Sequence, residues 1–110
     1  MRSRASYRSA ALAWIRKNLR DPSISVATVA EVVGVSERTL ARSFSEVGQS
    51  VAKNILEQRL DLAHRLLSRR GAPTVQDVAM YCGFVSPAHF SRVFRERFEQ
   101  SPAEVVATSL

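Results

Sequence analysis

The stretch SPAHFSRVFRERF, residues 86–98, interleaves three phenylalanines with three arginines. On a helix, which turns by about 100° per residue, Phe90, Phe94 and Phe98 fall on one apolar face together with Val93. The opposite face carries Ala88, Ser91, Arg92 and Arg95. The stretch therefore predicts an amphipathic helix with an apolar back and a cationic front, which serves either as a solvated face or as a surface for an anion.

The residues just before this helix predict a second helix and a tight turn. Thr74 is a favourable N-cap for VQDVAMYC, residues 75–82, and Ser86 is a favourable N-cap for the following helix. Pro87 would then occupy the first helical position, where its missing N–H costs nothing. Gly83 can end the first helix in the left-handed conformation. Together these signals predict a helix-turn-helix unit.

The same signals occur about fifty residues earlier. Ser25 precedes VATVAEVV, residues 26–33, and Ser36 precedes ERTLARSFSEV, residues 37–47. Six residue pairs match between the copies, the first three at an offset of 49 and the others at 50: Ser25 with Thr74, Ala30 with Ala79, Gly34 with Gly83, Leu40 with Phe90, Arg42 with Arg92, and Phe44 with Phe94. The extra residue falls in the turn, where an insertion leaves both helices intact. The chain therefore reads as an internal duplication.

The rest of the chain is also rich in helix formers and has no alternating strand pattern. A first helix is expected from about Tyr7 to Arg20, and a long helix from about Val51 to Ser68. The residues expected to point inward from the first helix and from residues 37–47 are Ala11, Trp14, Ile15, Leu19, Leu40, Phe44 and Val47. We predict an all-α fold with a basic flexible arm at 1–6, a first helix-turn-helix subdomain at 7–50, a linking helix at 51–69 and a second subdomain at 70–110.

The net charge of +6 belongs to the N-terminal segment. Residues 1–20 hold six basic residues and no acid, while the remaining ninety hold ten of each. The arginines at 2, 4 and 8 form either a disordered tail or an extension that seeks phosphates. No apolar run reaches the length of a membrane span, and a secretory signal is missing, so we expect a cytoplasmic protein without a membrane partner.

The sequence lacks the residue sets of catalytic and metal sites. His64 and His89 have no second ligand at metal spacing, and Cys82 has no activating neighbour in sequence and is expected to be a small buried residue. Neither a catalytic triad nor a glycine-rich phosphate loop is present. We therefore expect no enzyme activity, no cofactor, no metal and no small-molecule site in a domain of this size.

An arginine recurs on the predicted outer face of both second helices, as Arg42 and Arg92. In DNA-binding helix-turn-helix units, the outer face of the second helix enters the major groove. Because the duplicated unit carries arginine on this face twice, the pattern favours DNA recognition over a merely solvated face.

The segment DVAMYCGFVSPAHFSRVFRERFEQSP, residues 77–102, resembles the C-terminal signature of the AraC/XylS family of bacterial transcription regulators. The resemblance continues through VAEVVGVSERTLARSFSEVGQS and LEQRLDLAHRLL and covers roughly residues 20–106. It implies about seven helices, forming two helix-turn-helix subdomains joined by the long helix. The recognition helices, at about 37–47 and 87–98, would enter successive major grooves. Two positions depart from the family pattern: Glu99 replaces a usual glycine, and Val51 replaces a frequent proline.

The resemblance also implies roles for individual residues. The family's base-reading positions carry over to Arg38, Ala41, Arg42, Pro87, Ala88, Ser91 and Arg92. Arginine can bond guanine O6 and N7 at once, although Arg42 and Arg92 could also hold phosphates or internal carboxylates. Phosphate contacts are expected at Ser36 and Ser86, which are helix caps first but whose adjacent amides favour anions, and at Arg95, whose side chain fits a phosphate clamp. Arg97 projects into the apolar arc, where an acidic partner or snorkelling is expected.

These expectations describe a bacterial transcription regulator that binds double-stranded promoter or operator DNA as a monomer at the nucleoid. RNA polymerase is a further partner that is consistent with these expectations. The alternative is a helical protein-interaction module, for instance one contacting RNA polymerase, whose DNA affinity is only electrostatic. The chain would be either a stand-alone short regulator or the DNA-binding end of a longer protein.

Overall fold

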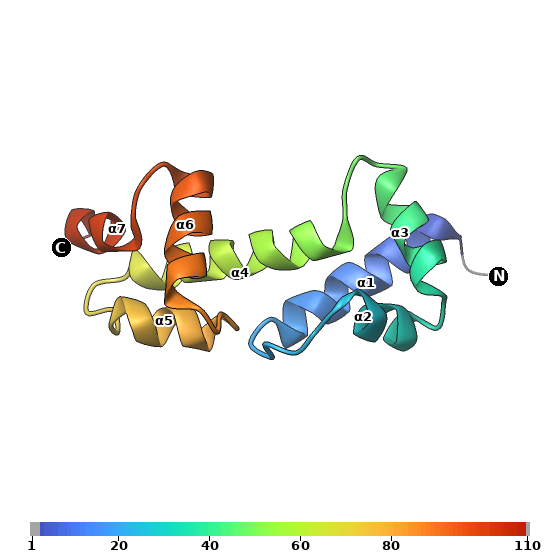
Figure 1. Cartoon of the computed structure of the whole chain (residues 1–110), viewed down its shortest axis with the longest axis horizontal. Helices are drawn as coiled ribbons and strands as arrows, with labels where there is room; N and C mark the ends of the chain where they lie inside the picture. Colours follow the sequence, from blue (N-terminus) through green and yellow to red (C-terminus); the bar gives the residue numbers. More distant parts are fainter. Residues whose placement is uncertain (1–2, 110) are drawn as a thin grey trace. The chain divides into compact units, whose positions relative to one another are not determined.

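The computed structural model describes residues 3–109, and in this range it contains seven α-helices and no strand (Figure 1). The all-α prediction is therefore confirmed. The helices, in chain order, are α1 (Arg4–Asn18), α2 (Val26–Val33), α3 (Glu37–Ser45), α4 (Val51–Leu67), α5 (Val75–Tyr81), α6 (Pro87–Phe98) and α7 (Pro102–Thr108).

The chain divides into two compact units. The first contains α1, α2, α3 and α4 up to Glu57, and the second contains the rest of the chain from Gln58 onwards. Residues 20–22, which follow α1, also belong to the second unit. Within it, Arg59 Nη2 donates to the carbonyl of Asp21 at 2.7 Å, and the Arg20 guanidinium lies 3.9 Å from the centre of the Tyr81 ring.

In the first unit, α1 packs against both α2 and α3. The fully buried residues Ala11, Ile15, Val29, Leu40 and Phe44 form the centre of this core. Their spacing of three or four residues along each helix places them on one face, as the sequence predicted. Burial of these apolar side chains orients α3, so that its opposite face meets solvent.

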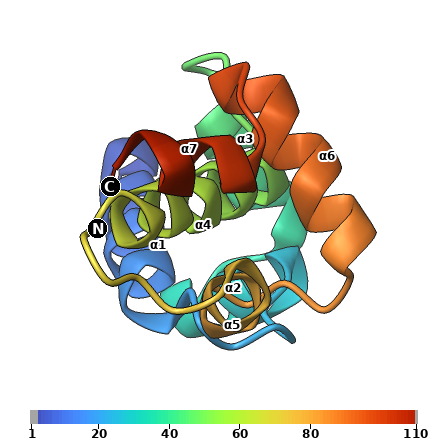
Figure 2. The ribbon, with the colours of Figure 1, turned by 90° about the vertical axis from the view of Figure 1, so that its left-hand side faces the viewer.

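In the second unit, α5, α6 and α7 surround the C-terminal part of α4 (Figure 2). The phenylalanines of α6 are its anchors, because Phe90 and Phe94 are at most 1% exposed and their ring centres lie 5.5 Å apart. Phe98 continues this row at 4.7 Å from Phe94, and His64 of α4 lies 4.5 Å from Phe98. The predicted apolar back of residues 86–98 is confirmed, and His64 packs against this row of rings.

Each of the two helix-turn-helix turns contains an equivalent backbone hydrogen bond. Gly34 and Gly83 adopt positive φ angles of 86° and 91°, in the left-handed region that glycine tolerates. In the first turn, the residue after the glycine, Val35, donates its N–H to the carbonyl of Ala30 at 3.1 Å. In the second turn, Phe84 donates to Ala79 at 3.0 Å. This repeated bond confirms that the sequence repeat is a structural duplication.

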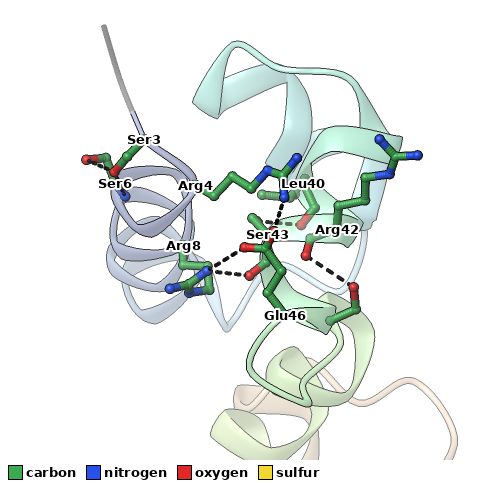
Figure 3. Close-up of polar contacts among 9 residues, drawn as sticks. Ser3, Arg4, Ser6, Arg8, Leu40, Arg42, Ser43 and Glu46 are labelled. Carbon is green, nitrogen blue, oxygen red and sulfur yellow. Dashed lines mark hydrogen bonds and ion pairs between the residues drawn. The ribbon is translucent and has the colours of Figure 1, made fainter.

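The N-terminal helix starts earlier than expected. α1 begins at Arg4, with Ser3 as its N-cap, so residues 4–6 are helical rather than part of a flexible arm. The expectation for Met1 and Arg2 lies outside the described residues. Two contacts accompany the early start: Ser3 Oγ accepts from the N–H of Ser6 and so caps the helix, and Arg4 forms an ion pair with Glu46, the C-cap residue of α3 (Figure 3).

Arg8, one turn after Arg4, holds the same end of α3. Its Nη1 donates to the carbonyl of Ser43 at 2.6 Å and lies 3.8 Å from the Glu46 carboxylate (Figure 3). A cation is favourable at the last carbonyls of a helix, where the helix dipole is negative. Arg4 and Arg8, which were expected either in a disordered tail or on phosphates, therefore bind the C-terminal end of α3.

Two inward-facing predictions need correction. Val47 is 48% exposed, because α3 ends at Ser45 and Val47 lies in the following turn, where the helical periodicity no longer applies. Trp14, expected in the core, is only half-buried. The ends of α1, α4 and α5 differ from the predicted ends by one to three residues, within the usual fraying of helix termini.

The last helix was implied only by family resemblance, although its start has a clear local signal. Ser101 accepts from the N–H of Glu104, the Glu104 carboxylate accepts from the N–H of Ser101, and Pro102 occupies the first turn. This is a complete capping box. Hydrogen bonds from Ser101 lower the pKa of Glu104, so the carboxylate stays charged at neutral pH.

Glu99, which replaces the family's usual glycine, is a non-glycine residue in the left-handed region, with φ at 57°. It ends α6, and its N–H donates to the carbonyl of Arg95 at 2.9 Å. The left-handed turn is therefore kept although the residue is not glycine. The Cβ atom of Glu99 makes this conformation sterically strained.

We predict that Glu99→Gly raises the free energy of unfolding by about 0.5–1 kcal/mol, because relief of the strained conformation exceeds the added entropy of the unfolded chain. Denaturant unfolding followed by circular dichroism measures the change. As a matched control, Glu96→Gly, which lies in the right-handed last turn of α6, should lower stability by up to ~1 kcal/mol. A loss of stability for Glu99→Gly would contradict the assignment of strain.

We also predict that Arg8→Met lowers the free energy of unfolding by about 1–2 kcal/mol, since it removes a charged donor from the carbonyl of the buried Ser43. The methionine keeps the apolar stem, so lost packing is kept small. Arg4→Met is the control, because Arg4 is 53% exposed and forms a surface ion pair worth less than ~1 kcal/mol. Equal losses for the two variants would show that the Ser43 bond is not the stabilising contact.

Candidate nucleic-acid interface

The first candidate reading surface is the exposed face of α3. Arg38, Ala41 and Arg42 are exposed, while Leu40 and Phe44 on the other side are fully buried. Figure 3 shows the Arg42 side chain directed away from the contact between Arg4 and Glu46. Among residues 3–109, no acidic side chain pairs with Arg38 or Arg42. Both guanidinium groups are therefore available to an anion or a base edge.

The second candidate surface is the corresponding face of α6. Pro87, Ala88, Ser91 and Arg92 are all exposed, and the opposite side of the helix buries its phenylalanines. The structure thus brings together, on each helix, the residues that sequence reasoning assigned to base contact. What they contact remains a prediction.

The two faces are related by the duplication but differ in charge. With the offset of fifty residues, Arg42 corresponds to Arg92, whereas Arg38 corresponds to Ala88. The first face can therefore make two arginine contacts with bases, and the second only one. A small apolar residue such as Ala88 leaves room for a thymine methyl group.

The serines expected at phosphates are helix caps in the structure. Ser36 Oγ accepts from the N–H of Thr39 at 3.1 Å, and Ser86 Oγ accepts from the N–H of His89 at 3.2 Å. The Ser36 hydroxyl also donates to Thr39 Oγ1, so both of its roles are used within the protein, whereas the Ser86 oxygen accepts only the capping N–H. An anion at either helix would meet the remaining N–H groups of the first turn, where the helix dipole is positive.

The two arginines at the end of α6 have different partners. Arg97 donates to both oxygens of Asp61 on α4, at 2.9 and 3.1 Å, which confirms the expected acidic partner. Arg95, the expected phosphate contact, lies 3.4 Å from Glu104 on α7 and remains 66% exposed. Glu104 was not foreseen as its neighbour. Such an exposed pair is weak, so a phosphate can compete for Arg95.

His89 is the residue of this surface that sequence reasoning did not assign to recognition. Its Nδ1 lies 3.1 Å from Nη2 of Arg92, on the same exposed side of α6. The spacing of three residues was a signal for this contact, because residues three apart are neighbours on a helix. A histidine three positions before a predicted reading arginine could have been noticed on that ground.

The thiol of Cys82 is not accessible to solvent. Cys82 is fully buried, and burial raises the pKa of its thiol to about 11, against the opposing effect of Arg65, Arg20 and Arg59. The thiol is therefore protonated and unreactive at neutral pH. The described residues contain no group of three metal-ligating side chains, and none of their helices is long and apolar enough to cross a membrane.

Comparison with known proteins identifies the family. The profile of the family described as Helix-turn-helix domain matches residues 29–108. Regulatory protein SoxS of Escherichia coli (strain K12) is 32% identical over 93 residues, which cover 84% of this chain and 86% of SoxS. A crystal structure of an AraC-type transcriptional regulator from Chromobacterium violaceum is 32% identical and superposes with a TM-score of 0.87, covering 96% of this chain and 93% of that one.

A further match is the DNA-binding domain of the global transcriptional factor AdpA, solved in complex with a target DNA. It is 33% identical and has a TM-score of 0.82, covering 91% of this chain and 89% of that one. Other curated relatives are longer, and the chain spans between 26% and 34% of the length of three of them. The duplicated units and these similarities together show that the chain belongs to the AraC-type helix-turn-helix family of DNA-binding transcription regulators.

Proposed function

We propose that the chain recognises specific double-stranded promoter or operator DNA by inserting α3 and α6 into successive major grooves. The observation that carries this proposal is the matched position of Arg42 and Arg92. Each lies on the exposed face of the second helix of its unit, directly opposite a buried aromatic anchor, Phe44 or Phe94. Because the core fixes the rotation of each helix, both arginines are directed outward for recognition.

The proposal assigns base reading to the exposed residues of the two helices, and phosphate contact to their N-terminal turns and to Arg95. Arg38, Arg42 and Arg92 would each bond the O6 and N7 atoms of guanine. Ala41, Pro87, Ala88 and Ser91 would contribute smaller contacts or leave room for the bases. Phosphate contacts near Ser36, Ser86 and Arg95 would fix the position of each helix on the duplex.

The biological setting is also part of the proposal. The chain would act as a monomer on DNA in the bacterial cytoplasm, associated with the nucleoid. Several relatives are described as transcriptional activators, among them RhrA and RhaS, which supports activation as the outcome of binding. We propose no enzyme activity, because the relatives and structural neighbours reported above are transcription regulators.

A second candidate function is contact with a protein such as RNA polymerase. The observation that favours it is a group of exposed apolar side chains in the second unit: Met80 is 72%, Tyr81 45% and Val85 83% exposed. Apolar groups of this kind often mark protein contacts. This role is compatible with DNA recognition, or it would replace recognition if DNA binding were only electrostatic.

Selection of binding sites from random duplex DNA tests the main proposal. We expect two short motifs with centres about 10–10.5 base pairs apart, one for each unit. Affinity at two salt concentrations should then show a strong preference for the selected site at both. If the selection yields no motif and binding collapses steeply with salt, DNA recognition by α3 and α6 is refuted and the protein-contact role is favoured.

Substitution of the arginines assigns each motif to its helix. We predict that Arg42→Ala and Arg92→Ala each remove about 1–3 kcal/mol of discrimination at one base pair, in different motifs. Arg95→Ala should instead weaken binding to all sequences alike and reduce the salt slope by about 1, as expected for one phosphate contact. Arg16→Ala, an exposed arginine of α1 outside the proposed surface, controls for the change in net charge.

A further inference from the structure

The contact between His89 and Arg92 has a defined hydrogen-bond direction. The Nη2 atom of Arg92 lies 3.1 Å from Nδ1 of His89. A guanidinium group has five N–H donors and no acceptor, so Nδ1 must be the acceptor. The contact therefore requires a neutral imidazole ring with its proton on Nε2. One of the arginine's five donors is used, and the others remain for a base.

His89 is more restrained than the arginine it contacts. Its ring centre lies 6.2 Å from that of Phe84, a residue of the turn that is only 7% exposed. Phe84 in turn packs against Phe90, with ring centres 4.8 Å apart. The backbone of His89 is also fixed, since its N–H donates to the capping hydroxyl of Ser86. The imidazole is exposed, but its contact with Phe84 links this acceptor to the core, beside the longer and also exposed Arg92.

The first unit has no equivalent of this arrangement. The residue that corresponds to His89 is Thr39, three positions before Arg42. The Thr39 hydroxyl accepts from Ser36 Oγ at 2.9 Å, so its hydrogen bonding is directed to the helix cap. The duplicated units therefore share an outward arginine, but only the arginine of α6 has a side-chain acceptor on its own helix.

We infer that His89 is a positioning residue for Arg92 and sharpens base recognition by α6. This inference rests on the proposed function, because it assumes that Arg92 reads a base pair. An arginine held near its bound geometry loses less conformational entropy when it binds and is less able to shift to a neighbouring base or phosphate. The histidine thereby raises the preference for one base without contacting DNA itself.

The test uses the full chain and the site obtained by selection from random duplex DNA. The position read by Arg92 is the base pair whose preference disappears in Arg92→Ala. At that position, we expect His89→Ala to reduce discrimination between the selected base and the other three by about 3- to 10-fold. Affinity for unrelated duplex DNA should stay unchanged, because no cation is removed.

Three further variants separate positioning from other roles. His89→Asn should restore discrimination, since its Oδ1 can accept from Arg92 at about the place of Nδ1. In the Arg92→Ala background, His89→Ala should not change the affinity for the selected site any further, because the histidine acts only through the arginine. Thr39→Ala, the matched change in α3, should leave discrimination at the base pair read by Arg42 unchanged. Thermal unfolding confirms that each variant is folded.

Several outcomes would overturn the inference. Full discrimination in His89→Ala would show that Arg92 needs no positioning, and failure of His89→Asn would show that the acceptor is not what matters. A further loss of affinity for the selected site from His89→Ala in the Arg92→Ala background would mean that the histidine contacts DNA directly. If the wild-type chain selects no sequence, the proposed function fails and this inference with it. If only the histidine variants disagree, the proposed function stands.

Discussion

The backbone hydrogen bond across each turn is the constraint on which the rest of the structure depends. The N–H after the turn glycine reaches the carbonyl of a small residue in the preceding helix, Ala30 or Ala79. This bond requires the left-handed glycine and fixes the direction in which the second helix leaves. Phe44 and Phe94, which are fully buried, then lie on the face of α3 or α6 that packs against the core. An outward arginine on the opposite side of each helix follows from that burial.

The charges of the chain are used in a way that the totals do not reveal. The N-terminal segment supplies the whole net charge, yet Arg4 and Arg8 are directed at the end of α3. In the remainder of the chain the formal charges balance, and there Arg38, Arg42 and Arg92 remain exposed. Bulk basicity alone would give no selectivity, because nonspecific attraction to phosphates is similar for every sequence.

The duplication provides two similar frames with different surface chemistry. Both units have the same turn and the same outward arginine, but α3 carries a second arginine where α6 carries Ala88. The second unit adds a histidine beside its arginine, and α7 provides a carboxylate near Arg95. On the proposed function, we interpret the first unit as making more contacts with DNA and the second as making fewer contacts that are better ordered.

Six of the seven helices, their caps, the turn glycines and the rotation of α3 and α6 could be predicted from local sequence patterns, whereas α7 was implied only by family resemblance. These features depend on residues within one or two turns of each other, such as Ser36 with the N–H of Thr39, so periodicity and capping rules suffice. The partners of the charged side chains depend on the tertiary fold. Arg8 lies 35 positions from Ser43 in the chain, and Arg97 lies 36 positions from Asp61. The exposure of Val47 depended on where α3 ends, and the ion pair between Arg4 and Glu46 joins residues 42 positions apart, so local propensity specifies neither.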